Sequence, residues 1–238
     1  MTQVMAQPAS QSSTQAVSVI TIDGPVSSGK GTIARRVAVA LGWHLLDSGA
    51  LYRLLGLHAR NLGVSLEDSD ALVPLARDLP ARFIEQRGDL LIELAGVDVS
   101  DFLRTEEVGE LASRVAVHQP VRDALMARQQ SFAQPPGLVA DGRDMGTVVF
   151  TRAPLKIYLT ASPEERARRR YNQLKEKGFD ANLAALVEDI RNRDERDMNR
   201  DVAPLKPADD ALVIDSTPLT IDDVLDRILG EARKRTLV

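Results

Sequence analysis

The sequence predicts an α/β fold of three layers, in which a central parallel sheet is covered by helices on both faces. Short apolar runs alternate with amphipathic segments of helical spacing along most of the chain, as in sheets built from strand–helix–strand units. A glycine-bounded loop joins the first apolar run, 17–22, to the first helical segment, 29–41. The 238 residues are 44% hydrophobic and 27% charged, which suits a globular chain with one large core.

The glycine-bounded loop has the spacing of a phosphate-binding loop. Gly24 is followed after four residues by Gly29 and Lys30, and backbone N–H groups in such loops point at phosphate oxygens. The following helix adds the positive end of its dipole, and the lysine would reach the outer phosphates. The alternative is a glycine turn without a ligand, which accounts less well for the strand before and the helix after. The residues expected to bind the donor phosphates are Gly24, Pro25, Val26, Ser27, Ser28, Gly29, Lys30, Gly31 and Thr32.

Hydrophobic periodicity predicts the rest of the frame. Apolar runs of four to six residues indicate buried strands, and apolar residues three and four apart indicate helices packed on them. Helix ends are marked by Gly42 and Gly178, by Pro120 at an early helical position, and by the capping-box pattern of Ser162 with Glu165. The expected strands are 17–22, 43–46, 138–141, 155–159 and 211–214. The expected helices are 29–41, 50–62, 120–132, 162–177, 183–200 and 221–235.

An insert and a basic helix stand apart from this alternation. Residues 73–117 contain alternating runs at 82–86 and 90–94 around a turn at 87–89, which predict a hairpin in a small antiparallel insert. The helical pattern that enters this insert is expected to break at Pro74.

The basic helix is expected to form a mobile helical lid over 163–182, because closure over phosphates would exclude water. A solvated helix or a nucleic-acid patch are the alternatives, and the acids around the run argue against the latter. Its basic residues are Arg166, Arg168, Arg169, Arg170, Lys175 and Lys177.

Composition excludes several classes of site and partner. The chain has no cysteine, so disulfides, thiolate metal sites and cysteine nucleophiles are excluded. A net charge of −4 and an aromatic content of 4% argue against a nucleic-acid partner. No stretch approaches the ~20 consecutive apolar residues of a membrane-spanning helix. We therefore expect a cytoplasmic protein with no nucleic acid and no membrane among its partners. The histidines, expected to be structural, are His44, His58 and His118.

Arginines near predicted strand ends are candidates for a second phosphate site. Phosphoryl transfer between nucleotides requires an acceptor phosphate held in line with the donor and neutralised. Arg143 follows a strand within Asp141-Gly-Arg-Asp144, whereas Arg53, in the first turns of a helix, fits a solvated position equally well. For three further charged residues, spacing alone favours ordinary salt bridges along the surface of a helix. This set, which shares one face of helix 183–200, is Arg193, Asp197 and Arg200.

Several segments together resemble the bacterial cytidylate kinases. The loop ends in Gly-Lys-Gly-Thr32, a variant of the phosphate-binding loop that is found in nucleoside monophosphate kinases. The more specific segments are Trp43-His-Leu-Leu-Asp-Ser-Gly-Ala50 with Tyr52-Arg53, Ala140-Asp-Gly-Arg-Asp-Met-Gly-Thr-Val-Val-Phe150, Arg191-Asn-Arg-Asp-Glu-Arg-Asp-Met-Asn-Arg200 and Ala211-Leu-Val-Ile-Asp-Ser-Thr217. The similarity covers roughly residues 17–235.

The resemblance implies transfer of the terminal phosphoryl group of ATP to CMP or dCMP with Mg2+. It assigns the acceptor nucleotide to Ser48, Arg53, Ser113, Arg122, Arg143, Asp144, Arg193, Asp197 and Arg200. Catalysis is expected to consist of positioning and charge neutralisation, without a covalent intermediate. The residues expected to provide it are Lys30, Arg143, Arg193 and Arg169. Thr32 and Asp141 would support a Mg2+ held mostly by phosphate oxygens and water.

The implied base-reading residues have a chemical rationale. Asp144 would accept a hydrogen bond from the amino group of cytosine, and Arg122 would donate to its N3 and O2 atoms. Uracil would place a carbonyl oxygen against the carboxylate, so we expect a strong preference for CMP over UMP. Two rival hypotheses remain: a kinase of the same fold for adenylate, uridylate or shikimate, and a regulatory module that only binds or hydrolyses ATP.

The expected organisation is a disordered tail over 1–16, which lacks the features of a secretory signal, followed by a single P-loop kinase domain over 17–238. Within this domain, the insert 73–117 would close on the acceptor nucleotide, and the lid 163–182 would close over the phosphates. The resemblance suggests a monomer.

Overall fold

Five parallel strands form the central sheet in the order β2-β6-β1-β7-β8. The structure, a computed structural model, describes residues 17–86, 89–176 and 178–238, so the predicted tail lies outside the described residues. The strands are β1 (Val19–Asp23), β2 (His44–Asp47), β6 (Leu138–Gly142), β7 (Leu155–Thr160) and β8 (Leu212–Asp215). In the centre, Asp23 of β1 is level with Gly142 of β6 and Tyr158 of β7. The predicted parallel sheet is confirmed.

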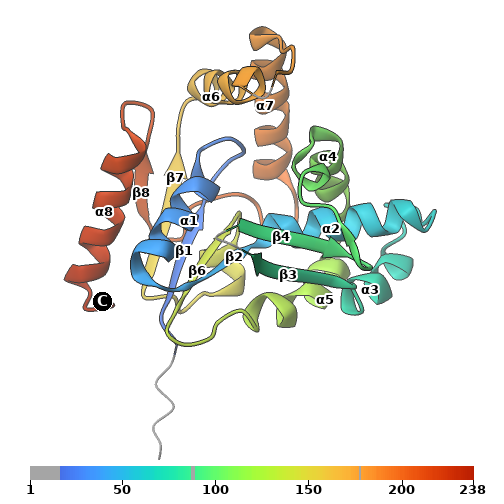
Figure 1. Cartoon of the computed structure of the whole chain (residues 1–238), viewed down its shortest axis with the longest axis horizontal. Coiled ribbons are helices and arrows are strands. Elements are labelled where there is room, and N and C mark those ends of the chain that lie inside the picture. Colours follow the sequence, from blue (N-terminus) through green and yellow to red (C-terminus); the bar gives the residue numbers. More distant parts are fainter. Residues whose placement is uncertain (1–16, 87–88, 177) are drawn as a thin grey trace, which may run out of the picture.

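Helices cover both faces of this sheet (Figure 1). One face packs on α1 (Lys30–Leu41) and α8 (Ile221–Lys234). The opposite core includes α2 (Ser48–Asn61), α3 (Ser69–Arg77), α4 (Glu106–Val115) and α5 (Gln119–Gln130). Side chains alternate along a strand, so β1 serves both cores, with Ile20 and Ile22 on the α1 side and Val19 on the other. The predicted three layers are confirmed, and the frame elements agree with the predicted ends to within two residues.

A small antiparallel sheet of β3 (Ala81–Gln86), β4 (Asp89–Leu94) and β5 (Val97–Asp98) lies within the predicted insert. The paired strands of the predicted hairpin are confirmed, whereas turn residues 87 and 88 lie outside the described residues. The predicted break at Pro74 is wrong, because α3 runs through it. The carboxylate of Asp68 caps this helix, and Leu72 and Ala76 are buried on either side of the proline. Cap and packing therefore offset the hydrogen bond that proline cannot donate.

Two further helices, α6 (Pro163–Glu176) and α7 (Leu183–Asn199), pack together beyond the carboxyl ends of the strands, at the top of Figure 1. The predicted capping box of α6 is half formed. Ser162 accepts from the Glu165 N–H at 3.2 Å, but its own N–H donates to Thr217 at 3.0 Å. Lys177 lies outside the described residues, and the closure of this segment stays a prediction.

The start of α2 places the second candidate phosphate site. The carboxylate of Asp47 accepts the Ala50 N–H at 3.0 Å, so the helix begins at Ser48, two residues earlier than predicted. Ser48 therefore belongs to the first helical turn beside the end of β2. None of the helices formed by the described residues is long and apolar enough to cross a membrane.

Candidate active site

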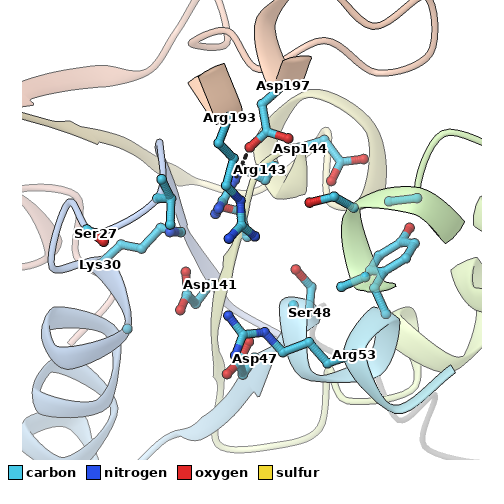
Figure 2. Close-up of a pocket in the computed structure, with 18 of the residues that line it drawn as sticks. Ser27, Lys30, Asp47, Ser48, Arg53, Asp141, Arg143, Asp144, Arg193 and Asp197 are labelled. Carbon is cyan, nitrogen blue, oxygen red and sulfur yellow. Dashed lines mark hydrogen bonds and ion pairs between the residues drawn. The ribbon is translucent and has the colours of Figure 1, made fainter. Parts of the chain in front are cut away.

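A cavity of about 290 Å³, the main cavity, opens where the carboxyl ends of β1, β2 and β6 meet α4 and α7. Parallel strands end at one edge of their sheet, which brings side chains from distant parts of the chain together. Figure 2 shows Lys30 on one side of the cavity, Ser48 and Arg53 on the other, and Asp141 between them.

The loop after β1 packs directly on the end of β7. A Cβ on Gly24 would lie 2.1 Å from the carbonyl oxygen of Leu159, so a larger residue would push the loop away from the sheet. Gly29 has a φ of 88° where the loop enters α1, a conformation that glycine adopts at little cost. These two glycines therefore fix the loop at the cavity.

Lys30 lies within the curve of this loop. Its Nζ donates to the carbonyl oxygen of Pro25 at 3.0 Å. Burial lowers the pKa of Lys30 to about 7, an effect that Arg143 strengthens and Asp141 opposes. The ammonium group lacks a strong counter-charge, and a phosphate at this point would supply one.

Asp141 faces Lys30 from the end of β6. Burial raises the pKa of Asp141 to about 7; Lys30 opposes this rise, whereas Asp47 adds to it. Its Oδ1 atom is buried without a hydrogen-bond partner. A Cβ on Gly31 would lie 3.2 Å from Oδ2, so glycine after the lysine lets α1 start close to this carboxylate.

Asp23 joins the end of β1 to the segment that carries Arg143 and Asp144. One carboxylate oxygen accepts the Met145 N–H at 2.8 Å, and the other accepts the Gly146 N–H at 2.8 Å. These N–H groups begin a π-helical turn, η2 (Met145–Val149). Asp23 thus fixes the backbone that presents Arg143 and Asp144.

Buried arginines crowd the main cavity. Burial alone would lower the pKa of Arg143, but Asp197, 3.0 Å away, raises it overall. Burial lowers the pKa of Arg193 to about 10, and Arg143 adds to that effect. The pKa of Arg53 is also lowered by burial, and this guanidinium donates to the Leu103 carbonyl oxygen at 2.6 Å. Such a concentration of buried positive charge suits phosphate groups.

A buried ion pair, Arg122–Asp144, lies in the main cavity on the side away from Lys30 (Figure 2). Arg122 also donates to the Ala116 carbonyl oxygen at 3.0 Å, and its guanidinium lies 5.6 Å from the centre of the Tyr52 ring. Ser113 also lines the main cavity. The pair offers one fixed donor and one fixed acceptor for a planar polar group.

A second cavity of about 410 Å³ lies between the loop, α6 and the start of α8. Arg169 borders it, donating to the Ser28 carbonyl oxygen at 3.2 Å and to Ser216 Oγ at 3.0 Å. Thr32 lines this cavity, whereas Asp141 lines the main cavity. The sequence prediction missed Ser216 and its neighbours, although Asp215-Ser-Thr217 follows a strand just as the other candidates do.

The basic run on α6 divides by contact. Arg166, one of the basic residues of the predicted lid, is buried against Asp194 of α7 and donates to the Val26 carbonyl oxygen at 3.1 Å. Arg168 is exposed and pairs with Glu165. Arg166 is therefore a fixed tie between α6, α7 and the loop.

Residues 20–234 match the family model described as "Cytidylate kinase". The chain is 58% identical over 212 residues to the cytidylate kinase of Colwellia psychrerythraea, an alignment that covers 89% of this chain and 94% of that protein. It is 60% identical over 223 residues to the cytidylate kinase of Stutzerimonas stutzeri, covering 93% of this chain and 97% of the relative. The chain belongs to the cytidylate kinase family. The predictions of the family and of a kinase that uses ATP are confirmed.

In this member of the cytidylate kinase family, the main cavity brings together the residues predicted for the acceptor nucleotide. It is lined by Ser48, Arg53, Ser113, Arg122, Arg143, Asp144, Arg193, Asp197 and Arg200. The phosphate-binding loop borders both cavities, with Lys30 at the main cavity and Gly29 at the second. Arg169, predicted to be catalytic, lines the second cavity. The roles of these individual residues stay predictions.

The structure adds Arg104 and Glu106 to the main cavity. Glu106 lies 2.6 Å from Arg170 and 4.0 Å from Arg193, so it connects α4 with both α6 and α7. A glutamate in the first turn of a helix, after the cap residue Thr105, is an ordinary helix-start signal. No local pattern distinguished Glu106 as a cavity residue.

Proposed function

We propose that this chain transfers the terminal phosphoryl group of ATP to CMP or dCMP, giving ADP and CDP or dCDP. One observation carries the proposal: a single cavity extends from Lys30 to the buried Arg122–Asp144 pair. The first end suits the transferring phosphoryl group, and the second suits the acceptor's base.

The acceptor's phosphate would lie among Arg53, Arg143 and Arg193. Their buried positive charges would neutralise it and hold it in line with the donor. The sugar would lie beside Asp197, whose carboxylate already orients Arg143 at 3.0 Å.

The base would be read at the Arg122–Asp144 pair. Cytosine presents an amino donor to the carboxylate and acceptors to the guanidinium. Uracil presents a carbonyl oxygen to the carboxylate, and an acceptor facing an acceptor in a buried site is strongly unfavourable. We therefore expect CMP to react much faster than UMP.

The donor would span both cavities, with its phosphates on the loop and its nucleoside beside Arg169 and Ser216. Mg2+ would neutralise and align the phosphates. Within the described residues, no His, Cys, Asp and Glu side chains form a group of three or more that could hold a metal. The unpartnered Oδ1 of Asp141 suits a hydrogen bond from a metal-bound water, and Thr32 offers a hydroxyl. A cation held mainly by phosphate and water fits this set.

The protein's own part in the reaction would be positioning and charge neutralisation. Lys30, Arg143 and Arg193 would together neutralise the negative charge of the transferring group. Arg169 would hold α6 against the loop through its hydrogen bond to the Ser28 carbonyl oxygen. The acceptor phosphate is already a nucleophile, so no side chain needs to remove a proton. A monomeric state and a cytoplasmic location remain part of the proposal.

Steady-state rates with CMP, dCMP, UMP and AMP at a fixed ATP concentration test this proposal through acceptor-dependent release of ADP. We expect efficient turnover with CMP and dCMP only. Faster turnover with UMP or AMP would overturn the base assignment. ATP binding without acceptor-dependent ADP release would overturn the proposed reaction.

Lys30→Ala tests the role of the loop. We expect the variant to fold and to lose most turnover, because the transferring charge loses its nearest cation. Near-normal activity in this variant would contradict the assignment of Lys30.

A further inference from the structure

A smaller cavity lies behind the base-reading end of the main cavity. This rear cavity measures about 100 Å³ and is bordered by α2, α5, the η2 turn and the segment after α7. Tyr52, Arg122 and Asp144 line both cavities, so they form the wall between them. The contents of the rear cavity therefore touch the back of the pair that we assign to cytosine.

Gln129 of α5 contributes a buried amide to the rear cavity. Its side chain belongs to a residue only 1% exposed, and neither Oε1 nor Nε2 has a protein group in hydrogen-bond geometry. The amide is nevertheless close enough to Tyr52 to oppose the effect of burial, which raises the pKa of the Tyr52 hydroxyl to about 12. Buried amides in native proteins are rarely left without partners, and ordered water commonly supplies them.

The rear cavity has the size and the lining that buried water requires. Its volume of about 100 Å³ is several times the ~30 Å³ that one water molecule takes up in the liquid. Its polar lining, which offers both donors and acceptors, is Tyr52, Gln119, Arg122, Gln129 and Asp144, and its apolar lining is Met126, Val148, Val149 and Ala203. Two or three water molecules could each find several polar partners here.

We propose that ordered water in the rear cavity links Gln129 to Tyr52, Arg122 and Asp144, and that Gln129 is a positioning residue for the choice of cytosine over uracil. This inference rests on the proposed function, because it concerns how the same site reads its acceptor. Arg122 holds the Asp144 carboxylate from one direction, and the water would hold it from behind. A carboxylate fixed in this way keeps an oxygen aimed at an amino group, whereas a less restrained one can turn away from a uracil carbonyl.

Gln129→Met tests the inference, because methionine has similar length and no hydrogen-bonding group that could replace the amide. We expect the ratio of kcat/KM for CMP to that for UMP to fall by about tenfold, as for the loss of one buried hydrogen bond. The KM for ATP should stay unchanged, since Gln129 lines neither the main nor the second cavity. Gln134→Met is the matched control, because Gln134 is exposed and donates to the Ser131 carbonyl oxygen.

Val148→Leu provides a second variant, which would displace water with a larger apolar side chain. Val148 lines the rear cavity but not the main cavity, and we expect it to lower the CMP preference in the same direction. An unchanged ratio in folded Gln129→Met, or an equal loss with every substrate, would overturn the positioning role.

A high-resolution crystal structure of the wild-type protein with CMP gives a readout that does not depend on how the variants fold. Water bonded to the Gln129 amide would support the inference, and an amide bonded only to protein groups would overturn it. If the wild-type protein itself fails to prefer CMP, the proposed function fails. If the wild-type preference is strong and Gln129→Met retains it, only this inference fails.

Discussion

Asp23→Asn tests whether the buried carboxylate of Asp23, which holds the backbone next to Arg143 and Asp144, lowers the free energy of unfolding when it ionises. Asp23 accepts the N–H groups of Met145 and Gly146, and burial raises its pKa from 3.8 to about 7 despite these two bonds. The rise means that the folded protein holds the proton of Asp23 over a range of pH in which the unfolded chain releases it.

The sign and size of the effect follow from this difference. Between pH 4 and 7 the unfolded chain binds fewer protons than the folded protein, so the wild-type protein loses stability as the pH rises. The loss is about 1.4 kcal/mol per pH unit, or about 4 kcal/mol for the rise from 3.8 to about 7. It ends above the folded pKa. Asparagine does not ionise, so the variant lacks this contribution.

Urea unfolding at pH 5 and pH 8, followed by the fluorescence of the single tryptophan, Trp43, measures the effect in both proteins. At pH 5 the side chain at position 23 is neutral in both folded proteins, and the difference in stability at this pH is the reference. At pH 8 the free energy of unfolding of the variant should have gained about 3 kcal/mol relative to the wild type. Asp141 and Lys30 titrate in both proteins, so most of their contribution cancels; the charge of Asp23 also raises the pKa of Asp141, and that part of the effect disappears in the variant. A difference between the two proteins that does not change with pH would refute the reasoning.

The same variant should lose activity at pH 8 even though it gains stability. An ionised Asp23 offers an acceptor to each of the two N–H groups, whereas asparagine offers one carbonyl oxygen. The backbone beside Arg143 and Asp144 would then be less firmly held, and the KM for CMP should rise. This outcome separates a positioning role from a purely destabilising buried charge.

Three further predictions concern Lys30, the ion pair between Arg166 and Asp194, and the close approach of Gly142 to Ser48. ATP binding without Mg2+ at pH 7.5 should take up protons, because phosphate favours the charged form of Lys30, whose pKa is about 7 in the free protein. Calorimetry in buffers of different ionisation enthalpy measures this uptake. Lys30→Met should reduce it to the contribution of Asp141, whose pKa is also about 7. Asp194→Ala leaves Arg166 buried without its carboxylate, so the free energy of unfolding should fall by about 3–5 kcal/mol in a urea titration, and a change below 1 kcal/mol would contradict the role of this tie. Gly142→Ala places a Cβ 2.6 Å from Ser48 Oγ; we expect an unfolding cost of about 1–3 kcal/mol and a raised KM for CMP, whereas an unchanged KM would argue against this close contact.

The frame and the position of the site could be predicted because both depend on local patterns. Strands buried on both faces are continuous apolar runs in the sequence, and the glycine-bounded loop marks the end of the first strand. The carboxyl ends of parallel strands lie at one edge of the sheet. Asp23, Ser48 and Asp141 could therefore be placed near each other without information on tertiary contacts.

Features that depend on distant partners could not be predicted in this way. Arg166 and Arg170 are four residues apart on one helix, yet Arg166 is buried against Asp194 while Arg170 pairs with Glu106. Sequence spacing places them on similar faces but contains no information about which neighbour lies opposite. Pro74 shows the same limit, because a cap and two buried side chains outweigh a local rule.

The buried positive charges of the main cavity are unfavourable until phosphate binds, and on the proposed function this favours transfer to a nucleotide over hydrolysis. Burial lowers the pKa of Arg53, that of Arg193 to about 10 and that of Lys30 to about 7, so each cation holds its proton at a cost before phosphate binds. Arg143 differs because Asp197 outweighs burial and raises its pKa. On the proposed function, phosphate oxygens would be the missing counter-charges, and the negative charge of a phosphoryl group in transit would lie between the lysine and the arginines. A water molecule attacking ATP would bring no charge to the acceptor arginines. Hydrolysis would therefore leave their electrostatic cost in place, whereas transfer to a nucleotide phosphate relieves it.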